Sequence, residues 1–304
     1  MRATKLKIPA TTSNFGSGFD AAGAALSLYN RVSLREMDSG GLSIRVTGEG
    51  AGHVAEDDRN IVYQAICRVF QKVEYRPAGL ELDLENAIPV ARGLGSSAAA
   101  RVGGLTAANI LSGSRLSQEE IIALAVELEG HPDNVVPAIV GGCVISTKHR
   151  DRIEYIRLEP PQPLKAVLVV PDFEVPTEMA RKALPSVLSF EDAIYGVGHA
   201  SLLTAALATG KLEHLRSAME DRMHQPYRAP LVPGMNELIQ AALNAGALGA
   251  AMSGAGPSML ALTREQPDHI GSRMQEVWRS MDIASRVLIL DMVSEGVTVE
   301  QANL

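Results

Sequence analysis

The composition of the chain limits the kinds of partner that it can have. It has 304 residues, of which 46% are apolar, and a formal net charge of -7 at pH 7. That apolar fraction can fill the core of one large domain or two ordinary ones, whereas an acidic chain without a basic run does not suit a nucleic-acid surface. We therefore expect a globular protein that binds a small molecule and no nucleic acid.

The cysteines and the N-terminal segment bear on the location of the protein. Cys67 and Cys143 lie far apart in the chain, which argues against a disulfide framework and a structural zinc site. The first ten residues lack the apolar run of a signal peptide, and no apolar segment reaches the roughly 18 residues of a membrane span. The sequence thus predicts a cytoplasmic protein with no membrane contact.

The early part of the chain alternates predicted strands with a predicted helix. Residues 28–37, 42–50 and 79–90 contain β-branched side chains in partial polar and apolar alternation, which is typical of strands. Residues 60–73 place apolar side chains at helical spacing, so we expect an amphipathic helix that covers a sheet.

Two further helices have recognisable starts. Ser96 and Ser97 lead into a segment rich in small residues, and this predicts a mostly buried helix that packs close to its neighbours. Ser117 and Glu120 have the spacing of a capping box, and Gly130 suits the end of that helix.

A proline cluster at residues 159–163 marks the expected domain boundary, after predicted strands at 141–146 and 153–158. Because strands and helices are interspersed on both sides of it, the pattern indicates an α/β or α+β class. The second half contains, in order, a strand at 164–170, helices between Thr177 and Asn244, a glycine-rich turn at 251–260, a helix around Trp278 and a final strand at 285–290.

The segment Pro89–Ala100, PVARGLGSSAAA, has the features of a phosphate-binding loop. Glycines let the backbone approach an oxyanion, and the free N–H groups at a helix start point towards it. The segment lacks the lysine of the Walker pattern and the third glycine of the dinucleotide fingerprint, so it is neither motif. Alone, such a turn is more often a plain helix start.

Two other glycine-rich turns accompany this loop, TTSNFGSGFD at Thr11–Asp20 and AMSGAGPSML at Ala251–Leu260. With EGHPDNVVPAIVGG at 129–142 and DRMHQPYRAPLVPG at 221–234, they resemble the motifs of the GHMP small-molecule kinase superfamily. Within that superfamily the chain is most similar to the homoserine kinases. The combination is specific, although each piece alone is not.

The resemblance implies a two-domain α+β GHMP kinase fold. A ribosomal-protein-like α/β domain would bind ATP in residues 1–160, and a ferredoxin-like domain would occupy residues 161–304. It also implies transfer of a phosphoryl group from ATP, with Mg²⁺, to the hydroxyl of L-homoserine, which gives O-phospho-L-homoserine on the route to threonine. A homodimer is compatible with the same resemblance.

By this resemblance the backbone amides from Gly93 to Ser97 bind the phosphates of ATP. Asn60 matches a family residue that helps to hold adenine, and its alternative role is a helix cap. The turn at Gly254–Ser258 would support the loop from the second domain. The implied ATP-binding residues are Asn60, Pro89, Val90, Ala91, Arg92, Gly93, Leu94, Gly95, Ser96, Ser97, Ala98, Ala99, Gly254 and Gly256.

Magnesium in phosphoryl transfer is held by oxygen ligands. The resemblance implies Ser97 and Glu129 as these ligands. Ser96 remains an alternative to Ser97, and Glu127 an alternative to Glu129.

An amino-acid acceptor needs partners for an ammonium, a carboxylate and a hydroxyl. Arginine suits the carboxylate because its planar fork donates two parallel hydrogen bonds, and Asp20 can accept from the ammonium or the hydroxyl. Thr177 and Arg181 lie four residues apart, so a helix would present both to one ligand. The residues that match substrate contacts of the family are Asn14, Asp20, His131, Thr177, Arg181 and Arg228.

Asp20, Asn134 and Arg181 are the expected catalytic residues. Several superfamily members, mevalonate kinase among them, have a general-base aspartate where this chain has Asn134. An amide cannot abstract a proton near neutral pH, so we expect catalysis by positioning and charge stabilisation, with the proton leaving late. The direction of the Asp133 side chain stays open.

Two other functions are compatible with part of these sequence motifs. A kinase of threonine, shikimate or a mevalonate-type alcohol would have the same loops, but a mevalonate-type acceptor has no ammonium for Asp20 to bind. A non-catalytic regulator with this fold would have no need of intact loop glycines, Ser97 and Glu129.

Overall fold

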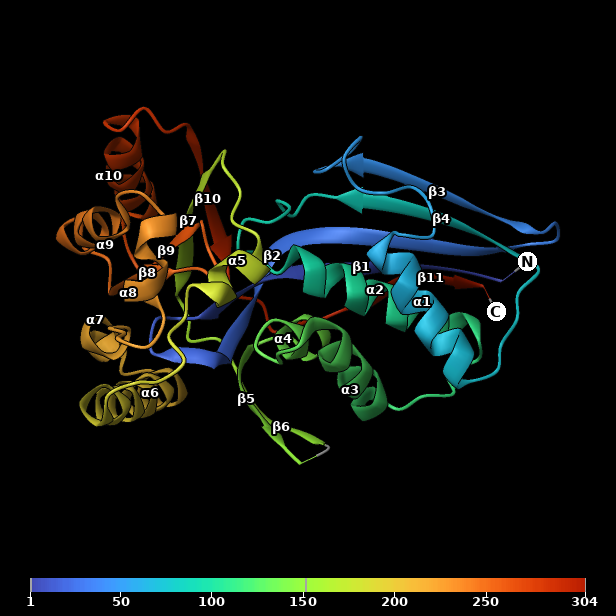
Figure 1. The fold of residues 1–304 in the computed structure, drawn as a ribbon, viewed down its shortest axis with the longest axis horizontal. Helices are drawn as coiled ribbons and strands as arrows, with labels where there is room; N and C mark the ends of the chain where they lie inside the picture. Colours follow the sequence, from blue (N-terminus) through green and yellow to red (C-terminus); the bar gives the residue numbers. More distant parts are fainter. Residues whose placement is uncertain (1, 151, 304) are drawn as a thin grey trace.

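Two β-sheets form the framework of the computed structural model, which describes residues 2–150 and 152–303 (Figure 1). The first sheet has the order β11-β1-β2-β4-β3, with β5 paired to β2 and β6 to β5. Its strands are β1 (Ala3–Asn14), β2 (Gly18–Met37), β3 (Gly41–Gly48), β4 (Gly79–Asn86), β5 (Cys143–His149), β6 (Arg152–Leu158) and β11 (Thr298–Asn303).

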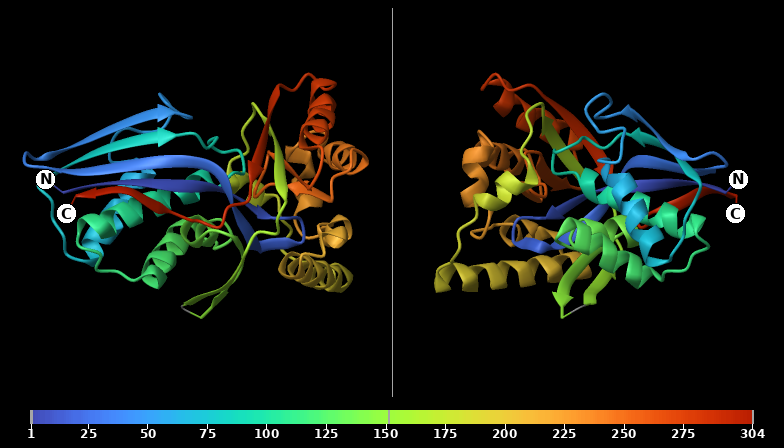
Figure 2. Two further views of the ribbon diagram at one scale, coloured as in Figure 1. Left: turned by 180° about the vertical axis from the view of Figure 1, so that it is seen from behind. Right: turned by 45° about the vertical axis from the view of Figure 1, so that its right-hand side comes forward.

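Four helices lie along one face of the first sheet (Figures 1 and 2). They are α1 (Ile61–Lys72), α2 (Ser96–Leu111), α3 (Gln118–Glu129) and α4 (Val135–Val140). The predicted capping box of Ser117 and Glu120 is present at α3, and Gly130 ends that helix in the left-handed conformation, with φ +95°. α2 is mostly buried, as predicted, and a Cβ added to Gly104 would lie 2.4 Å from the carbonyl oxygen of Val62 in α1. Small residues thus let α1 and α2 pack closely.

The second sheet has four antiparallel strands in the order β10-β7-β9-β8. They are β7 (Lys165–Pro171), β8 (Gly249–Met252), β9 (Met259–Thr263) and β10 (Ser285–Asp291). Helices α9 (Met235–Asn244) and α10 (Pro267–Arg279) cover one face, and Trp278 is fully buried between them and the sheet. Numbered along the chain, this strand order is 4-1-3-2 with helices after the first and third strands, which is the expected ferredoxin-like arrangement.

Several further helices lie along the chain between β7 and α9. They are α5 (Thr177–Lys182), α6 (Phe190–Thr209), α7 (Leu215–Ala218), α8 (Gln225–Arg228) and the 3-10 turns η1 (Leu212–His214) and η2 (Ala229–Leu231). α6 is the longest of them and lies at the outer edge of the molecule (Figure 1). No helix within the described residues has the length and apolar character of a membrane span.

The sequence motifs correspond to connections in the two sheets. The turn at 11–20 joins β1 to β2, the turn at 251–260 joins β8 to β9, and the proline cluster at 159–163 lies where the chain passes from the first sheet to the second. Four strands have no predicted counterpart, β1, β8, β9 and β11. Of these, β1 and β11 pair antiparallel from Ala3 with Asn303 onwards. The strand predicted at 285–290 is therefore not the last one, because residues 298–303 return to the first sheet.

Candidate active site

The loop before α2 has the geometry of an anion-binding site. Gly93 and Gly95 have φ of +73° and +69°, and added Cβ atoms would lie 2.2 Å from the carbonyl oxygen of Ser253 and 1.9 Å from Oγ1 of Thr11. Both positions therefore require glycine. Gly95 is the N-cap residue of α2 and makes no side-chain capping bond, so no side chain of the cap covers the N–H groups of the first turn.

The three glycine-rich turns meet at one cleft between the two sheets. The amide of Gly254 donates to the carbonyl oxygen of Ser13 at 3.1 Å, and the amide of Thr11 donates to that of Leu94, also at 3.1 Å. The cleft encloses about 580 Å³, part of it open to solvent. Its lining residues are Ser13, Asn14, Asp20, Ala91, Arg92, Gly93, Gly95, Ser96, Ser97, Glu129, His131, Asp133, Asn134, Thr177, Arg181, Arg228, Gly254 and Ala255.

An ion pair stands on one wall of this cleft. Arg181 of α5 donates two hydrogen bonds to Asp20, from Nη2 to Oδ1 at 2.9 Å and from Nη1 to Oδ2 at 3.1 Å. Asp20 has a left-handed backbone, with φ +56°, and its amide donates to Oδ1 of Asn14 at 2.9 Å. Nδ2 of Asn14 in turn donates to the carbonyl oxygen of Gly254 at 2.8 Å. The side-chain amide of Asn14 thus links Asp20 to the turn between β8 and β9 of the second sheet.

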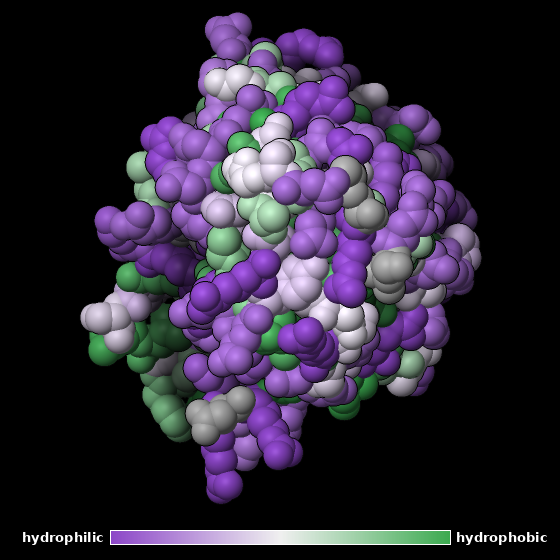
Figure 3. All heavy atoms as spheres, turned by 90° about the vertical axis from the view of Figure 1, so that its right-hand side faces the viewer, coloured by the Kyte–Doolittle hydropathy of each residue, from purple (hydrophilic) through white to green (hydrophobic). Residues whose placement is uncertain are grey.

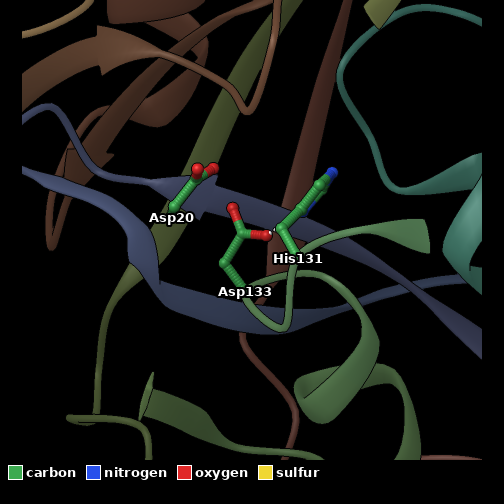
Figure 4. Close-up of side chains that lie close together, drawn as sticks. All are labelled: Asp20, His131 and Asp133. Carbon is green, nitrogen blue, oxygen red and sulfur yellow. Dashed lines mark hydrogen bonds and ion pairs between the residues drawn. The ribbon is translucent and has the colours of Figure 1, made fainter. Parts of the chain in front are cut away.

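A second carboxylate lies beside this pair. Asp133, in the loop after α3, contacts Nδ1 of His131, and Figure 4 shows both side chains near Asp20. Polar atoms of the three residues lie within 4.8 Å of one another. Burial raises the pKa of Asp133, but hydrogen bonds from His131 and Ser13, with the charge of Arg181, outweigh it and hold the pKa below its ordinary value. Asp133 therefore carries a negative charge in the cleft.

The side-chain amide of Asn134 is fixed by two hydroxyl groups. Thr11 donates from Oγ1 to Oδ1 of Asn134 at 2.8 Å, and Nδ2 of Asn134 donates to Oγ of Ser13 at 2.9 Å. These contacts hold the amide in place and leave one acceptor lone pair and one N–H for a ligand. Thr11 and Ser13 have this positioning role although no sequence pattern assigned it to them.

Two oxygen ligands of the type that Mg²⁺ prefers lie together in the lining of the cleft. Oγ of Ser97 donates to Oε2 of Glu129 at 3.0 Å, and Arg101 contacts both of these atoms. Glu127, the alternative to Glu129, is absent from the cleft lining and forms an ion pair with Arg68 at 2.6 Å. A hydroxyl and a carboxylate next to a phosphate loop fit a magnesium ion. Ser96 also lines the cleft and remains an alternative to Ser97.

Arg228, the last residue of α8, lines the cleft and is only 2% exposed. Its Nε donates to the carbonyl oxygen of Ala180 at 3.1 Å, and its guanidinium lies over the ring of Phe19. Burial and the nearby charge of Arg181 lower the pKa of Arg228 to about 10, against the opposing effect of Asp20. Arg228 is therefore still a cation at neutral pH.

The comparisons with known proteins agree with this arrangement. The family description "GHMP kinases N terminal domain" matches residues 60–142, and "GHMP kinases C terminal" matches residues 203–280. A homoserine kinase of Microchaete diplosiphon is 45% identical, over 95% of this chain and 94% of that protein. One of Caldicellulosiruptor bescii is 42% identical, over 97% and 96%. This chain belongs to the homoserine kinases of the GHMP family.

Solved structures agree with the membership in the homoserine kinases. The crystal structure of homoserine kinase from Cytophaga hutchinsonii has a TM-score of 0.89 and 32% identity, and covers 98% of this chain and 97% of that one. The mevalonate kinase of L. major, at 18% identity and a TM-score of 0.71 over 96% and 97% of the two chains, shares the fold. The predicted two-domain α+β GHMP fold is thus confirmed.

Some residues implied by the resemblance to homoserine kinases lie outside the cleft. Asn60 caps α1, because its Oδ1 accepts from the amides of Val62 and Tyr63, and its Nδ2 donates to the carbonyl oxygen of Ala55 at 2.6 Å. Pro89 and Val90 line an adjoining hollow that Arg92 also borders. Leu94, Ala98 and Ala99 are core residues, and Gly256 packs against Met252. Their contacts with ATP stay predictions.

Proposed function

We propose that this chain transfers the γ-phosphoryl group of ATP to the side-chain hydroxyl of L-homoserine and so forms O-phospho-L-homoserine on the route to threonine. The observation that carries this proposal is the ion pair of Asp20 and Arg181, which lines the same cleft as the phosphate loop. An amino acid carries an ammonium and a carboxylate together, so a carboxylate beside a guanidinium complements it. Membership in the homoserine kinases supports the same substrate.

Each group of the acceptor then has a partner. Asp20 and Asp133, with His131, receive the ammonium, while Arg181 and Arg228 receive the carboxylate. Thr177, one helical turn before Arg181, borders the same space. The hydroxyl lies near the free lone pair and N–H of Asn134. These assignments separate an amino-acid acceptor from a mevalonate-type alcohol, which has no ammonium.

The ATP phosphates lie at the start of α2, where the amides from Gly93 to Ser97 donate to them. Ser97 and Glu129 would hold Mg²⁺, which would neutralise part of the charge on the phosphates. The acceptor oxygen bonds to the γ-phosphorus, the bond to the β-phosphate oxygen breaks, and the hydroxyl proton passes to the transferred phosphoryl group. Asn134 offers no base, and the lowered pKa of Asp133 makes it a poor one.

A screen of acceptors tests the main proposal. With Mg-ATP, we expect L-homoserine to stimulate ADP release in a coupled assay, and ³¹P NMR to detect a phosphate ester. Threonine, shikimate and mevalonate should give much smaller rates. If homoserine gives no stimulation, the proposal is wrong, and stimulation by another acceptor would identify a different alcohol kinase.

A matched pair of glutamates tests the magnesium ligands. We expect Glu129→Gln to weaken binding of Mn²⁺, a spectroscopic substitute for Mg²⁺, at least about tenfold in the presence of a non-hydrolysable ATP analogue. Glu127→Gln, two residues away on the outer face of the same helix, should bind Mn²⁺ like the unchanged protein. Equal weakening in both variants would contradict the assignment.

The remaining parts of the proposal concern the whole molecule. The change of sheet between β6 and β7 supports a boundary between residues 160 and 161, with β11 crossing back to the first sheet. We also infer a cytoplasmic enzyme that forms a homodimer and binds neither membrane nor nucleic acid.

A further inference from the structure

Arg101 is the one charged residue of α2, a helix that is mostly buried. Hydrophilic side chains cover most of the outer face at the end of the molecule where the two termini lie (Figure 3). The side chain of Arg101, by contrast, is only 24% exposed, and it stands among alanine, valine and glycine residues of its own helix. A guanidinium that is largely removed from water needs hydrogen-bond acceptors and a negative charge close by.

The hydrogen bonds of Arg101 go to the two expected metal ligands. Its Nη1 donates to Oγ of Ser97 at 2.9 Å and to Oε2 of Glu129. Ser97 and Arg101 lie one turn apart on α2, and Glu129 is the last residue of α3, so these contacts join two helices. Among the described residues Arg101 has no other hydrogen-bond partner and no other ion pair.

These contacts leave part of each ligand available. The Ser97 hydroxyl donates to Oε2 of Glu129 at 3.0 Å and accepts from Arg101, so one of its two lone pairs remains. Oε1 of Glu129 has no hydrogen-bond partner in the part of the chain that the structure describes. Arg101 therefore fixes both side chains and still leaves a hydroxyl lone pair and a carboxylate oxygen for a cation.

Arg101 also cancels the charge that would attract a divalent cation. The Glu129 side chain is 10% exposed, and the guanidinium in contact with it brings the summed charge of the two side chains to zero. A cation held by Oγ of Ser97 has Arg101 as its neighbour, and like charges repel each other strongly in a partly buried site. The phosphates of ATP carry the negative charge that this pair lacks.

We propose that Arg101 is a positioning residue that holds Ser97 and Glu129 in place and keeps their affinity for divalent cations low until ATP is bound. Magnesium then enters the cleft with the nucleotide, because only the phosphates supply enough negative charge to hold it beside the guanidinium. This inference rests on the proposed function, which assigns Ser97 and Glu129 to Mg²⁺. Arg101 itself acts through these two side chains.

A purely structural ion pair between α2 and α3 is the competing explanation for Arg101. The two explanations differ in what happens when the guanidinium is removed. Loss of a structural partner leaves the Glu129 carboxylate buried and unpaired, which lowers the stability of the protein and does nothing else. In our proposal the same unpaired carboxylate becomes a better metal ligand. A divalent cation alone should then take the place of the missing guanidinium.

Binding of Mn²⁺ to the protein without nucleotide, measured by electron paramagnetic resonance, tests this inference. We expect Arg101→Gln to bind Mn²⁺ at least about tenfold more tightly than the unchanged protein, and Mn²⁺ to raise the melting temperature of this variant more. Arg101→Met should show the same gain, which guards against a folding defect of one variant. Arg101→Lys keeps the charge and should bind Mn²⁺ like the unchanged protein. So should Arg68→Gln, the matched control, which removes the partner of Glu127 on the same helix as Glu129.

Glu129→Gln separates this inference from the proposed function. Combined with Arg101→Gln, it should abolish the gained Mn²⁺ binding, and a gain that persists would overturn the inference, because the cation would then be held elsewhere. If Glu129→Gln alone weakens Mn²⁺ binding beside the ATP analogue but neither Arg101→Gln nor Arg101→Met gains Mn²⁺ binding without nucleotide, the magnesium ligands are correct and the role of Arg101 is wrong. If Glu129→Gln has no effect beside the analogue, the magnesium assignment itself fails.

Discussion

The hydroxyl of Ser253 donates a hydrogen bond of 2.7 Å to the carbonyl oxygen of Gly93. The same hydroxyl lies 2.8 Å from Oγ1 of Thr12. Gly93 belongs to the phosphate loop, Thr12 to β1 and Ser253 to the turn after β8, so one buried side chain joins the three glycine-rich segments of the cleft.

Ser253→Ala should weaken ATP binding. The change leaves the Gly93 carbonyl and the Thr12 hydroxyl without this partner, which costs about 1–3 kcal/mol in a buried site. We expect a higher KM for ATP, by about tenfold, and a lower melting temperature. Ser258→Ala is the control, because Ser258 lies in the same turn, is fully buried, and its hydroxyl has no hydrogen-bond partner among the described residues. An equal effect of both changes would show that Ser253 acts only through packing.

Asp20→Asn should impair homoserine binding more than ATP binding. The amide keeps the size of the carboxylate but loses the charge that pairs with Arg181 and, in our proposal, with the ammonium. We expect KM for L-homoserine to rise at least about tenfold, with KM for ATP within about twofold of its usual value. Asp57→Asn removes a carboxylate from an exposed pair with Arg59 and should change neither constant. A KM for homoserine that stays constant in Asp20→Asn would contradict the assignment.

Asn134→Asp tests whether the reaction needs a base. A carboxylate here would lose the N–H that Ser13 accepts and would add a second buried charge beside Asp133. We expect kcat to fall at least about tenfold. Thr11→Val, which removes the other contact of the Asn134 amide, should lower kcat in the same direction with little change in KM for ATP. A large rise of kcat in Asn134→Asp would show that the no-base mechanism is wrong.

His224 should make the protein less stable in mild acid. Its ring is fully buried; Nε2 lies 2.9 Å from the Gly16 carbonyl oxygen and Nδ1 lies 3.3 Å from Nη1 of Arg228, which suits the neutral form. Burial, with the charge of Arg228, lowers the pKa of His224 from its ordinary 6.5 against the opposing charge of Asp221. As the pH falls, the unfolded chain therefore binds a proton at His224 before the folded protein does. The stabilisation that neutral His224 contributes is complete above pH 6.5, and it is lost as the pH falls through the pKa of His224 in the folded protein.

Urea unfolding at pH 7.5 and pH 5.5 checks this expectation. The free energy of unfolding should be lower at pH 5.5, with at most about 1.4 kcal/mol of the difference due to His224. His224→Gln keeps a donor for the Gly16 carbonyl but cannot titrate, so the difference between the two pH values should shrink. His149→Gln changes an exposed histidine and should leave the difference between the two pH values unchanged. If His224→Gln shows the full difference, another group titrates.

Local chemistry explains which parts of the fold were predictable. The capping box at Ser117, the glycine end at Gly130 and the small-residue helix depend on neighbouring residues, and each was predicted correctly. β11 was not predicted, because it is largely exposed and its pairing partner β1 lies almost 300 residues earlier. Strands that depend on such distant partners have a weak local signal.

Contacts between distant segments also limited what the sequence could show of the candidate site. Motif context identified Asn14, Asp20, His131, Asn134 and Arg181, all of which line the cleft. It did not show that Asp133 points inward or that Thr11 orients Asn134, since both facts depend on how separate segments meet. The sequence also could not show which of Glu127 and Glu129 faces the cleft, because this depends on the orientation of α3, which places Glu127 against Arg68.

The pairing of β11 with β1 has a consequence for the order of events during translation. β1 leaves the ribosome before β11, the edge partner that covers it, and almost 300 residues separate the two strands. Until then β1 is an open strand edge, the kind of surface on which nascent chains associate wrongly. The first sheet is therefore complete only after residues 298–303 have been made, and a chain stopped before residue 298 would keep that edge exposed for its whole lifetime.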